Sequence, residues 1–397
     1  MDNRAGPATR ENIVKKRSLP LVVAVALHAP LSLAQVHVVA DGQTDAYTLI
    51  DRSLISPGST ARAIETPDCL HPDFGPHITQ VFDVDLAKPV FVFHLHRDID
   101  GDGSANGGCQ RIDRQRLEIK TFGPSPDSVK AFLGDTVSYR WRFKLDADFQ
   151  VSTSFTHIHQ IKAGDGTNAD SPIITLTPVR LSSGSEVMEI RYDGSGAGVF
   201  TRFQRLPLAP FKGAWLEARE TVIFTEPGAF SMEIRRVGDG AVLLSDSHVD
   251  IPTWRSGGTT FVRPKWGLYR SLNQIASLRD EQVRFDGFCL AKGTEECPRL
   301  AAAPWQAGVA YQVGDLATNE SDTWKCIQPH RSQSDWVPPQ VPALWVKVPR
   351  TQEWTQPVQY PLGAEVTYQG ATYSCRQPHT SLPGWTPPAT PALWLPK

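Results

Sequence analysis

The strongest constraint on the fold is an internal repeat near the C-terminus, in which nearly every unusual side chain recurs 49 residues later. The matched pairs are Trp305 and Trp354, Tyr311 and Tyr360, Gly314 and Gly363, Trp324 and Tyr373, Cys326 and Cys375, His330 and His379, and Trp336 and Trp385. Each unit is short and rich in proline, so it can bury only a small core. Its aromatic side chains must therefore be divided between that core and an exposed surface.

The position of each aromatic residue indicates which role it takes. The tryptophans that frame the two repeats are expected in the core: Trp305, Trp345, Trp354 and Trp394. Trp336 and Trp385 lie in loops followed by two prolines, which can hold an indole flat and exposed. We assign Trp324 and Tyr373, which are equivalent positions in strand-like segments, to the same surface.

The pattern W…Y…G…[WY]xCxxxH…WxPP…PALW resembles the carbohydrate-binding modules of families 5 and 12 of chitinases, here at 304–348 and 350–396. The resemblance implies two small three-stranded modules that bind insoluble chitin or cellulose through exposed aromatic rings. A sugar ring that covers on the order of 100 Å² of indole contributes roughly 2.5 kcal/mol at about 25 cal/mol per Å². Binding by one ring is weak, and a tethered second module rebinds at an effective concentration of about millimolar.

The N-terminus has the order of a secretory signal peptide. Basic residues at 15–17 precede an apolar run from Leu19 to Leu33, and small residues lead to an expected cleavage site after Ala34. We therefore expect residues 1–34 to be removed and the protein to be secreted. With 40 Lys and Arg against 42 Asp and Glu, the net charge of -2 argues against nucleic acid or an anionic membrane as partner. We expect a monomer.

The six cysteines fit an oxidising compartment. Cys289 and Cys297 are expected to close a small loop, and Cys69 and Cys109 are the candidates for a second bridge. Cys326 and Cys375 occur once in each repeat, so we expect buried free thiols there.

Residues 35–297, which a short linker at 298–303 separates from the repeats, alternate short apolar stretches with turn residues. Examples are VFVFHLH, SYRWRFKL, PIITLTPV, EVMEIRYDG and FSMEIRRVG. Long amphipathic helices are absent from the pattern, so the fold class is all-β, with a two-sheet β-sandwich or jelly roll for this region.

Three strand-like segments gather polar side chains, because residues two apart in a strand point the same way. The aligned sets are Arg114, Arg116, Glu118 and Lys120 in DRQRLEIKT, His157 and His159 in FTHIHQIK, and Lys265, Gly267 and Tyr269 in RPKWGLYRS. A strand in which Arg, Glu and Lys alternate is also typical of a solvated outer face with weak ion pairs. Together the three segments predict a charged groove.

The three segments resemble the RxE, [QH]xH and KxGxY motifs of jelly-roll (concanavalin-like) polysaccharide lyases of the alginate-lyase and glucuronan-lyase type. His157 stands where the alginate enzymes usually have glutamine. The resemblance implies β-elimination on a uronate-containing, anionic polysaccharide. Neutralisation of the substrate carboxylate then falls to Arg116 and His157.

The remaining roles follow from the same chemistry. Tyr269, with Lys265 beside it and His159 opposite, is the candidate acid or base, and Glu118 would orient Arg116 by a bidentate pair.

Two other functions stay open. A glycoside hydrolase would need two carboxylates that flank the bond, but no ExDxE strand occurs and Glu217 and Glu220 are spaced differently. A lectin-like domain that only binds carbohydrate is the other alternative.

No cofactor is required by these functions, and no metal is assigned to the expected catalytic site. The pairs His94/His96 and His157/His159 could gather a transition metal, although no acidic ligand stands at a matching spacing. Asp98, Asp100 and Asp102 suggest either a structural Ca²⁺ loop or a solvated turn, because the twelfth position is Cys109 rather than glutamate.

Overall fold

The structure is a computed structural model. It describes residues 1, 35–86, 88–103, 110–238, 240–294, 296–297, 300, 304–311, 315–320, 322–347, 352–356, 358–360, 365–369 and 371–396. The expected signal peptide, apart from its first residue, and most of the expected linker lie outside this set. No helix among the described residues has both the length and the apolar character needed to cross a membrane.

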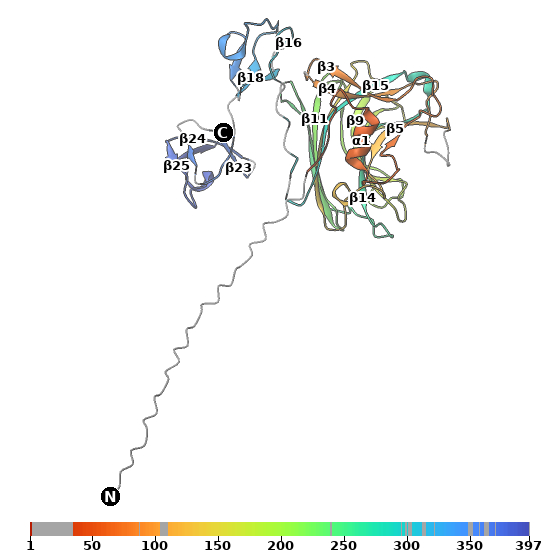
Figure 1. The fold of residues 1–397 in the computed structure, drawn as a ribbon, viewed down its shortest axis with the longest axis horizontal. Helices are drawn as coiled ribbons and strands as arrows, with labels where there is room; N and C mark the ends of the chain where they lie inside the picture. Colours follow the sequence, from red (N-terminus) through yellow and green to blue (C-terminus); the bar gives the residue numbers. More distant parts are fainter. Residues whose placement is uncertain are drawn as a thin grey trace. The chain divides into compact units, whose positions relative to one another are not determined.

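The large N-terminal region is a sandwich of two antiparallel sheets, which confirms the all-β class (Figure 1). Sheet A has the order β13 (Val242–Ile251), β12 (Gly228–Arg236), β11 (Leu216–Ile223), β6 (Thr136–Leu145), β15 (Glu281–Lys292), β4 (Lys88–Leu95) and β3 (Ile78–Asp83), with β1 (Val36–Val38) paired to β15. Sheet B has the order β10 (Thr201–Pro207), β9 (Glu186–Tyr192), β8 (Pro172–Arg180), β7 (Thr156–Ala163), β14 (Val262–Ser271), β5 (Arg114–Lys120) and β2 (Ile64–Glu65).

Every strand-like segment found in the sequence lies in one of these strands, because alternating apolar residues fill the space between the sheets. In β5, Leu117 and Ile119 enter the core, while Arg116 and Glu118 lie on the outer face. Short 3-10 helices connect strands at η2 (Asp127–Val129), η3 (Ala209–Phe211) and η4 (Ile275–Ser277).

One helix, α1 (Ala46–Leu54), packs beside the sandwich and was not expected (Figure 1). Asp45 caps it by accepting a hydrogen bond from the backbone N–H of Thr48 at 3.0 Å. Its buried side chains are Ala46, Tyr47, Leu49, Ile50 and Leu54. Its nine residues are too few for a convincing helical period in the sequence.

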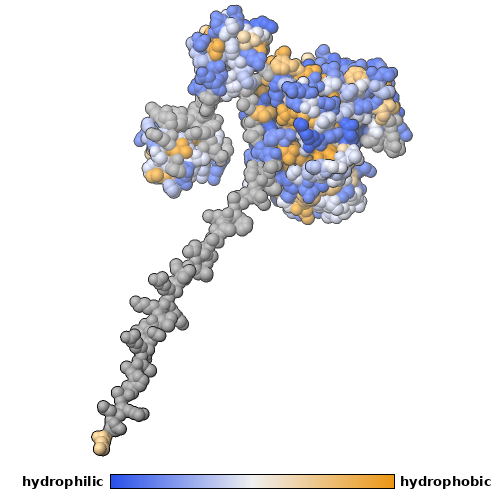
Figure 2. Space-filling view, in the orientation of Figure 1, coloured by the Kyte–Doolittle hydropathy of each residue, from blue (hydrophilic) through white to orange (hydrophobic). Residues whose placement is uncertain are grey.

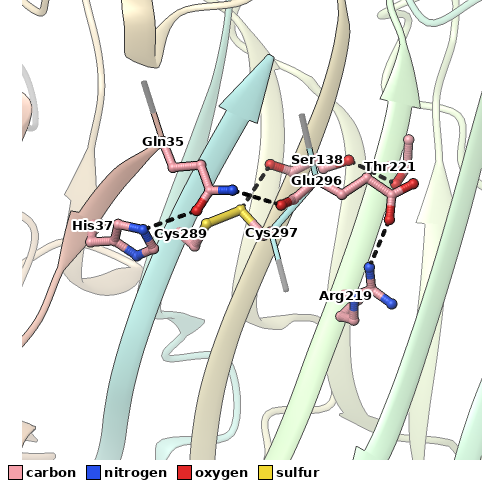
Figure 3. The surroundings of a disulfide bond; sticks show 8 residues. All are labelled: Gln35, His37, Ser138, Arg219, Thr221, Cys289, Glu296 and Cys297. Carbon is pink, nitrogen blue, oxygen red and sulfur yellow. Dashed lines mark hydrogen bonds and ion pairs between the residues drawn. A yellow bond between two sulfur atoms is a disulfide. The ribbon is translucent and has the colours of Figure 1, made fainter. Parts of the chain in front are cut away.

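A disulfide joins Cys289 of β15 to Cys297, as expected (Figure 3). The neighbouring Glu296 holds this segment in place, since its carbonyl accepts from Gln35 at 2.9 Å and its carboxylate from Arg219 at 3.1 Å. Cys69 is also disulfide-bonded, while Cys109, its expected partner, lies outside the described residues.

Each C-terminal repeat forms its own small β-unit. The first has β17 (Leu316–Asn319), β18 (Asp322–Cys326) and β20 (Trp345–Lys347), and the pair β16 (Ala310–Tyr311) and β19 (His330–Arg331). The second has β23 (Glu365–Tyr368), β24 (Ala371–Cys375) and β26 (Trp394–Pro396), and the pair β22 (Gln359–Tyr360) and β25 (His379–Thr380). A fourth strand, β21 (Gln352–Glu353), adds in parallel to β23, so this sheet exceeds the three strands expected.

The cores of both units contain the residues that the sequence placed there. Trp345 and Trp394 are almost completely buried, and Trp305 and Trp354 pack against the same two cores. Cys326 and Cys375 are buried free thiols, as expected.

Candidate functional site

Polar side chains from four neighbouring strands meet on the outer face of sheet B. We call this group the sheet B cluster; its members are Glu65, Arg114, Arg116, Glu118, His157, Gln160, Lys265 and Tyr269. The register brings all three motifs together, because Tyr269 of β14 pairs with Arg116 of β5 on one side and with His157 of β7 on the other.

Gly267 allows β14 and β5 to approach closely at the centre of the cluster. Its φ is 149°, and a Cβ there would lie 2.1 Å from the carbonyl oxygen of Leu117. The KxGxY segment therefore requires glycine at this position.

Glu118 is the centre of the ion-pair network. Its Oε2 accepts from Arg116 at 2.9 Å and from the Lys265 amine at 2.6 Å, while its Oε1 accepts from Gln160. The expected bidentate pair between Glu118 and Arg116 is therefore wrong, because Arg116 Nε instead donates to Asp102 at 3.0 Å. Glu118 positions Arg116 together with Asp102.

Lys265 lies beneath the surface of the cluster. It is 1% exposed and bridges Glu118 and Glu65. Burial alone would raise the pKa of Glu65. The charges of Lys265 and Arg116 outweigh that effect and hold the pKa well below its ordinary value. Lys265 is thus a positioning residue.

Lys265→Met is expected to lower the free energy of unfolding by about 3 kcal/mol, because it removes the more deeply buried of the two cations, Lys265 and Arg116, that both carboxylates share. Urea unfolding of the sandwich measures this loss. Lys120→Met is the matched control, since Lys120 binds the same Glu65 at 2.9 Å from a more exposed position. Equal losses for the two variants would contradict the central role of Lys265.

Tyr269 is held between two guanidinium groups. Its hydroxyl accepts from Arg114 at 2.8 Å, and the Arg116 guanidinium lies 3.8 Å from the ring centre. Burial raises the pKa of Tyr269 above its ordinary value, against the opposing charges of Arg116 and Arg114. The phenol therefore keeps its proton at neutral pH, so this resting state favours the acid role over a preformed phenolate.

His157 lies close to this phenol, with a ring-centre distance of 5.9 Å. Its Nδ1 is 2.7 Å from the Thr177 hydroxyl, and its ring stacks on Phe155. Burial, and then the positive charge of Arg191, hold the pKa of His157 well below its ordinary value. His157 is therefore neutral at pH 7.

The expectation that His159 shares this face is wrong. His159 is fully buried between the sheets, where its Nε2 lies 2.8 Å from Glu220 and its ring packs on Trp141 and Trp266. The pairing of β14 with β7 shifts between Trp266 and Tyr269, and this bulge turns His159 inward. Gln160 instead reaches the cluster, where it donates to Glu118.

The outer face of sheet B carries more positive charge than the three motifs indicated. Further cations come from β7, β9, β10 and β14: Lys162, Arg191, Arg202, Arg205 and Arg263. Burial, and then the charges of Lys265 and Arg263, lower the pKa of Lys162 to about 7. These residues come from four strands that are far apart along the chain, so their place on one face could not be predicted from local patterns.

The other acidic residues considered from the sequence do not act together: the two glutamates lie outside the sheet B cluster, and the three aspartates contact different partners. Glu217 pairs with Arg142 at 3.1 Å and Glu220 with His159, so neither joins the sheet B cluster. Asp98 pairs with Arg97 and Asp102 with Arg116, whereas Asp100 faces three histidines. The three aspartates, for which a Ca²⁺ loop and a solvated turn were the alternatives, thus contact different partners.

The expected ligand-binding rings of the C-terminal units are all at least partly accessible. Trp385 is 38% exposed, while Trp336, Trp324 and Tyr373 are half-buried. Turns place Trp336 and Trp385 just before the proline-containing 3-10 helices η5 (Pro338–Gln340) and η6 (Pro387–Ala389). Hydrophobic residues stand among hydrophilic ones on the visible face of each unit (Figure 2).

Residues 304–346 and 353–395 each match the model of carbohydrate-binding module family 5/12. Curated relatives match over a similar length: Chitinase D of Niallia circulans is 56% identical over 45 residues, which are 11% of this chain and 9% of that protein. Streptogrisin-C of Streptomyces griseus is 58% identical over 44 residues, 11% of this chain and 10% of that protein. The chain thus spans about a tenth of the length of these relatives.

Solved structures similar to the chain include an endo-beta-1,4-glucuronan lyase from Trichoderma reesei, with 14% identity, a TM-score of 0.39, and coverage of 54% of this chain and 86% of that one. A PL-14 alginate lyase from Aplysia kurodai has 9% identity and a TM-score of 0.43, and covers 66% of this chain and 99% of that one. These are proteins of the type whose motifs the sequence resembles. Any assignment of function depends on this chain's own side chains.

Proposed function

We propose that the protein is a secreted polysaccharide lyase that cleaves a uronate-containing polymer by β-elimination and is anchored to chitin by its two C-terminal modules. The observation that carries the lyase assignment is the grouping of a protonated Tyr269, two guanidinium groups and a neutral His157 on one cationic face. Such a face attracts an anionic polymer.

The chemistry needs a base at C5 of the uronate and an acid at the C4 oxygen. His157 is the base, because it is neutral and its Nε2 makes no hydrogen bond to the described part of the protein. Tyr269 is the acid, because it retains its proton. The ring-centre distance of 5.9 Å lets the two side chains reach adjacent atoms of one sugar.

In the proposed reaction, His157 takes the C5 proton and the C5–H electron pair forms the C4–C5 double bond. The C4–O bond breaks, and the leaving oxygen takes the proton of Tyr269. Proton transfer from His157 to Tyr269, directly or through water, restores the resting state. Arg114 and Arg116 stabilise the negative charge that develops on the substrate carboxylate.

The same face is poorly suited to glycoside hydrolysis. That reaction needs a carboxyl group that holds its proton near neutral pH. The charges of neighbouring cations lower the pKa of both Glu65 and Glu189, although burial alone would raise it. Glu118 is buried and ion-paired with Lys265 and Arg116, so it is committed to positioning.

A panel of polyglucuronate, alginate and hyaluronan tests the proposal. The expected result is ultraviolet absorbance from the unsaturated product on at least one polymer. New reducing ends without that absorbance would show hydrolysis. Binding without cleavage would show a lectin-like domain.

His157 and Tyr269 are expected to keep their working protonation states from about pH 6.5 to about pH 10, so within this range activity should change only as the nearby Lys162 loses its charge at about pH 7. Below this range His157 becomes protonated and can no longer act as base, which gives the rate profile its acidic limb. Because the pKa of His157 is lowered, this limb should lie at a pH below the ordinary pKa of histidine. Above the range Tyr269 loses its proton, and its raised pKa moves the basic limb upward. Initial rates on the cleaved polymer across the range check this profile.

Arg191→Gln provides the control for the acidic limb. Removal of this charge is expected to raise the pKa of His157 and so to move the acidic limb to higher pH. An acidic limb that stays in place in this variant would contradict the assignment of His157.

A further inference from the structure

We propose that His71, His77, His96 and Asp100 form a structural binding site for a divalent transition metal, with Zn²⁺ as the ion that fits best. Each residue offers one ligand atom, and these four atoms lie within 4.8 Å of one another. The site is separate from the sheet B cluster and does not depend on the lyase proposal.

Asp100 contacts all three imidazoles, although the four residues come from different segments. Asp100 Oδ1 lies 3.2 Å from His71 Nδ1 and 3.2 Å from His77 Nε2, and its Oδ2 lies 3.1 Å from His96 Nδ1. Zinc bonds of about 2.0–2.1 Å place neighbouring tetrahedral ligands about 3.3 Å apart. The contacts of Asp100, made through both of its oxygens, already match this spacing, whereas ligand atoms as far as 4.8 Å apart would have to approach by up to about 1.5 Å when the metal binds.

The surroundings of His77 resemble those of a metal-bound histidine. While Nε2 faces the other ligands, Nδ1 lies 2.7 Å from Asp68, whose carboxylate also accepts from the Tyr47 hydroxyl at 2.9 Å. A carboxylate on the distal nitrogen fixes the tautomer and orientation of a metal-binding imidazole. Helix α1 supplies Tyr47, so the fold builds this outer shell.

The ligand set selects the metal. Three imidazoles and one carboxylate suit Zn²⁺, whereas Ca²⁺ prefers six to eight oxygen ligands. Asp100 is fully buried, and Phe74 covers the group with its ring 4.3 Å from that of His96. A buried carboxylate is costly unless it meets a cation, and a bound metal ion is one group that can meet that need.

The ion would hold the turn that positions Arg116. Gln115 donates to the carbonyl of Asp100 at 2.8 Å, and the N–H of Arg116 donates to Gly101 at 3.0 Å. The next residue, Asp102, accepts from the Arg116 side chain. The metal site would therefore fix the 96–102 turn through His96 and Asp100, while Asp102 at the end of the same turn binds Arg116 of the sheet B cluster.

The test uses the full chain without a histidine tag, dialysed first against a chelator and then against Zn²⁺. We expect one Zn²⁺ per chain by mass spectrometry of the metal, and an increase in Tm on its addition. His71→Ala is expected to weaken binding at least about 100-fold, and Asp68→Asn about 10- to 100-fold. Competition with a chromogenic chelator measures both affinities.

His94→Ala is the matched control. His94 lies two residues from His96, packs on the same Phe74 ring and binds Thr79, but belongs outside the ligand set. It should bind Zn²⁺ as the unmodified chain does. Co²⁺ substitution should give tetrahedral visible bands without the thiolate bands that Cys326 or Cys375 would add.

Three results would overturn the proposal: no zinc retained at micromolar concentration, equal affinity in His71→Ala and the unmodified chain, or thiolate bands in the Co²⁺ form. The first would identify a hydrogen-bonded histidine cluster only. None of these results decides whether the unmodified chain forms unsaturated product, so failure of the metal site and failure of the lyase proposal are distinguishable.

Discussion

Tyr269→Phe is expected to reduce β-elimination by about 10²- to 10⁴-fold, the contribution typical of a positioned acid. The change removes one oxygen, which accepts a hydrogen bond from Arg114 in the resting protein. The ring stays between Arg116 and Phe155, so the Tm should change little. Formation of unsaturated product and thermal unfolding of the same preparation measure the two effects.

Tyr192→Phe is the matched control for this variant. Tyr192 also lies in sheet B, and its hydroxyl donates to the carbonyl of Pro252 at 2.8 Å, away from the cluster. It should retain full activity. A Tyr269→Phe protein as active as this control would show that another group protonates the leaving oxygen.

Much of the sandwich could be predicted because its strands carry their own signal. Apolar alternation in segments such as 114–120 and 186–192 is sufficient to identify the strands and their inner faces. Helix α1 was missed because it is short. The partners of each strand could not be predicted, since the pairing of β2 with β5 depends on long-range packing.

The sheet B cluster could be predicted only in part, for the same reason. The motifs placed Arg116, Glu118 and Tyr269 correctly relative to one another, because they face each other across one strand pair. His159 was misplaced because a bulge changes the alternation, and a bulge in a neighbouring strand leaves no signal in the histidine segment itself. Gln160 was overlooked as a consequence.

The proposed metal ligands could not be grouped from local sequence patterns, because they come from different segments of the chain. His96 was considered only with His94, its neighbour in the strand, whereas its partners His71 and His77 lie in a loop before β3. Asp100 was grouped with other aspartates at alternate positions. The density of histidines between 71 and 96 was the one signal available in the sequence.

The combined change Trp336→Ala and Trp385→Ala is expected to abolish retention on insoluble chitin. Each indole contributes roughly 2.5 kcal/mol, so the loss of both is about 5 kcal/mol, or several thousandfold in affinity at about 1.4 kcal/mol per tenfold. Each single change should leave one weakly binding module and remove the avidity of the pair. Pull-down on chitin and on cellulose at several protein concentrations measures this series.

The repeat itself supplies the control for this prediction. Val346 and Leu395 occupy equivalent strand positions, in β20 and β26, and both side chains are about half exposed. Val346→Ala with Leu395→Ala removes exposed apolar surface from both modules but no flat ring, so retention should persist. If both double variants bound equally well, the contact would have to lie on other residues, and Trp324 and Tyr373 would be the next pair to replace. If both failed to bind, general apolar adhesion would explain the retention better than stacking on sugar rings.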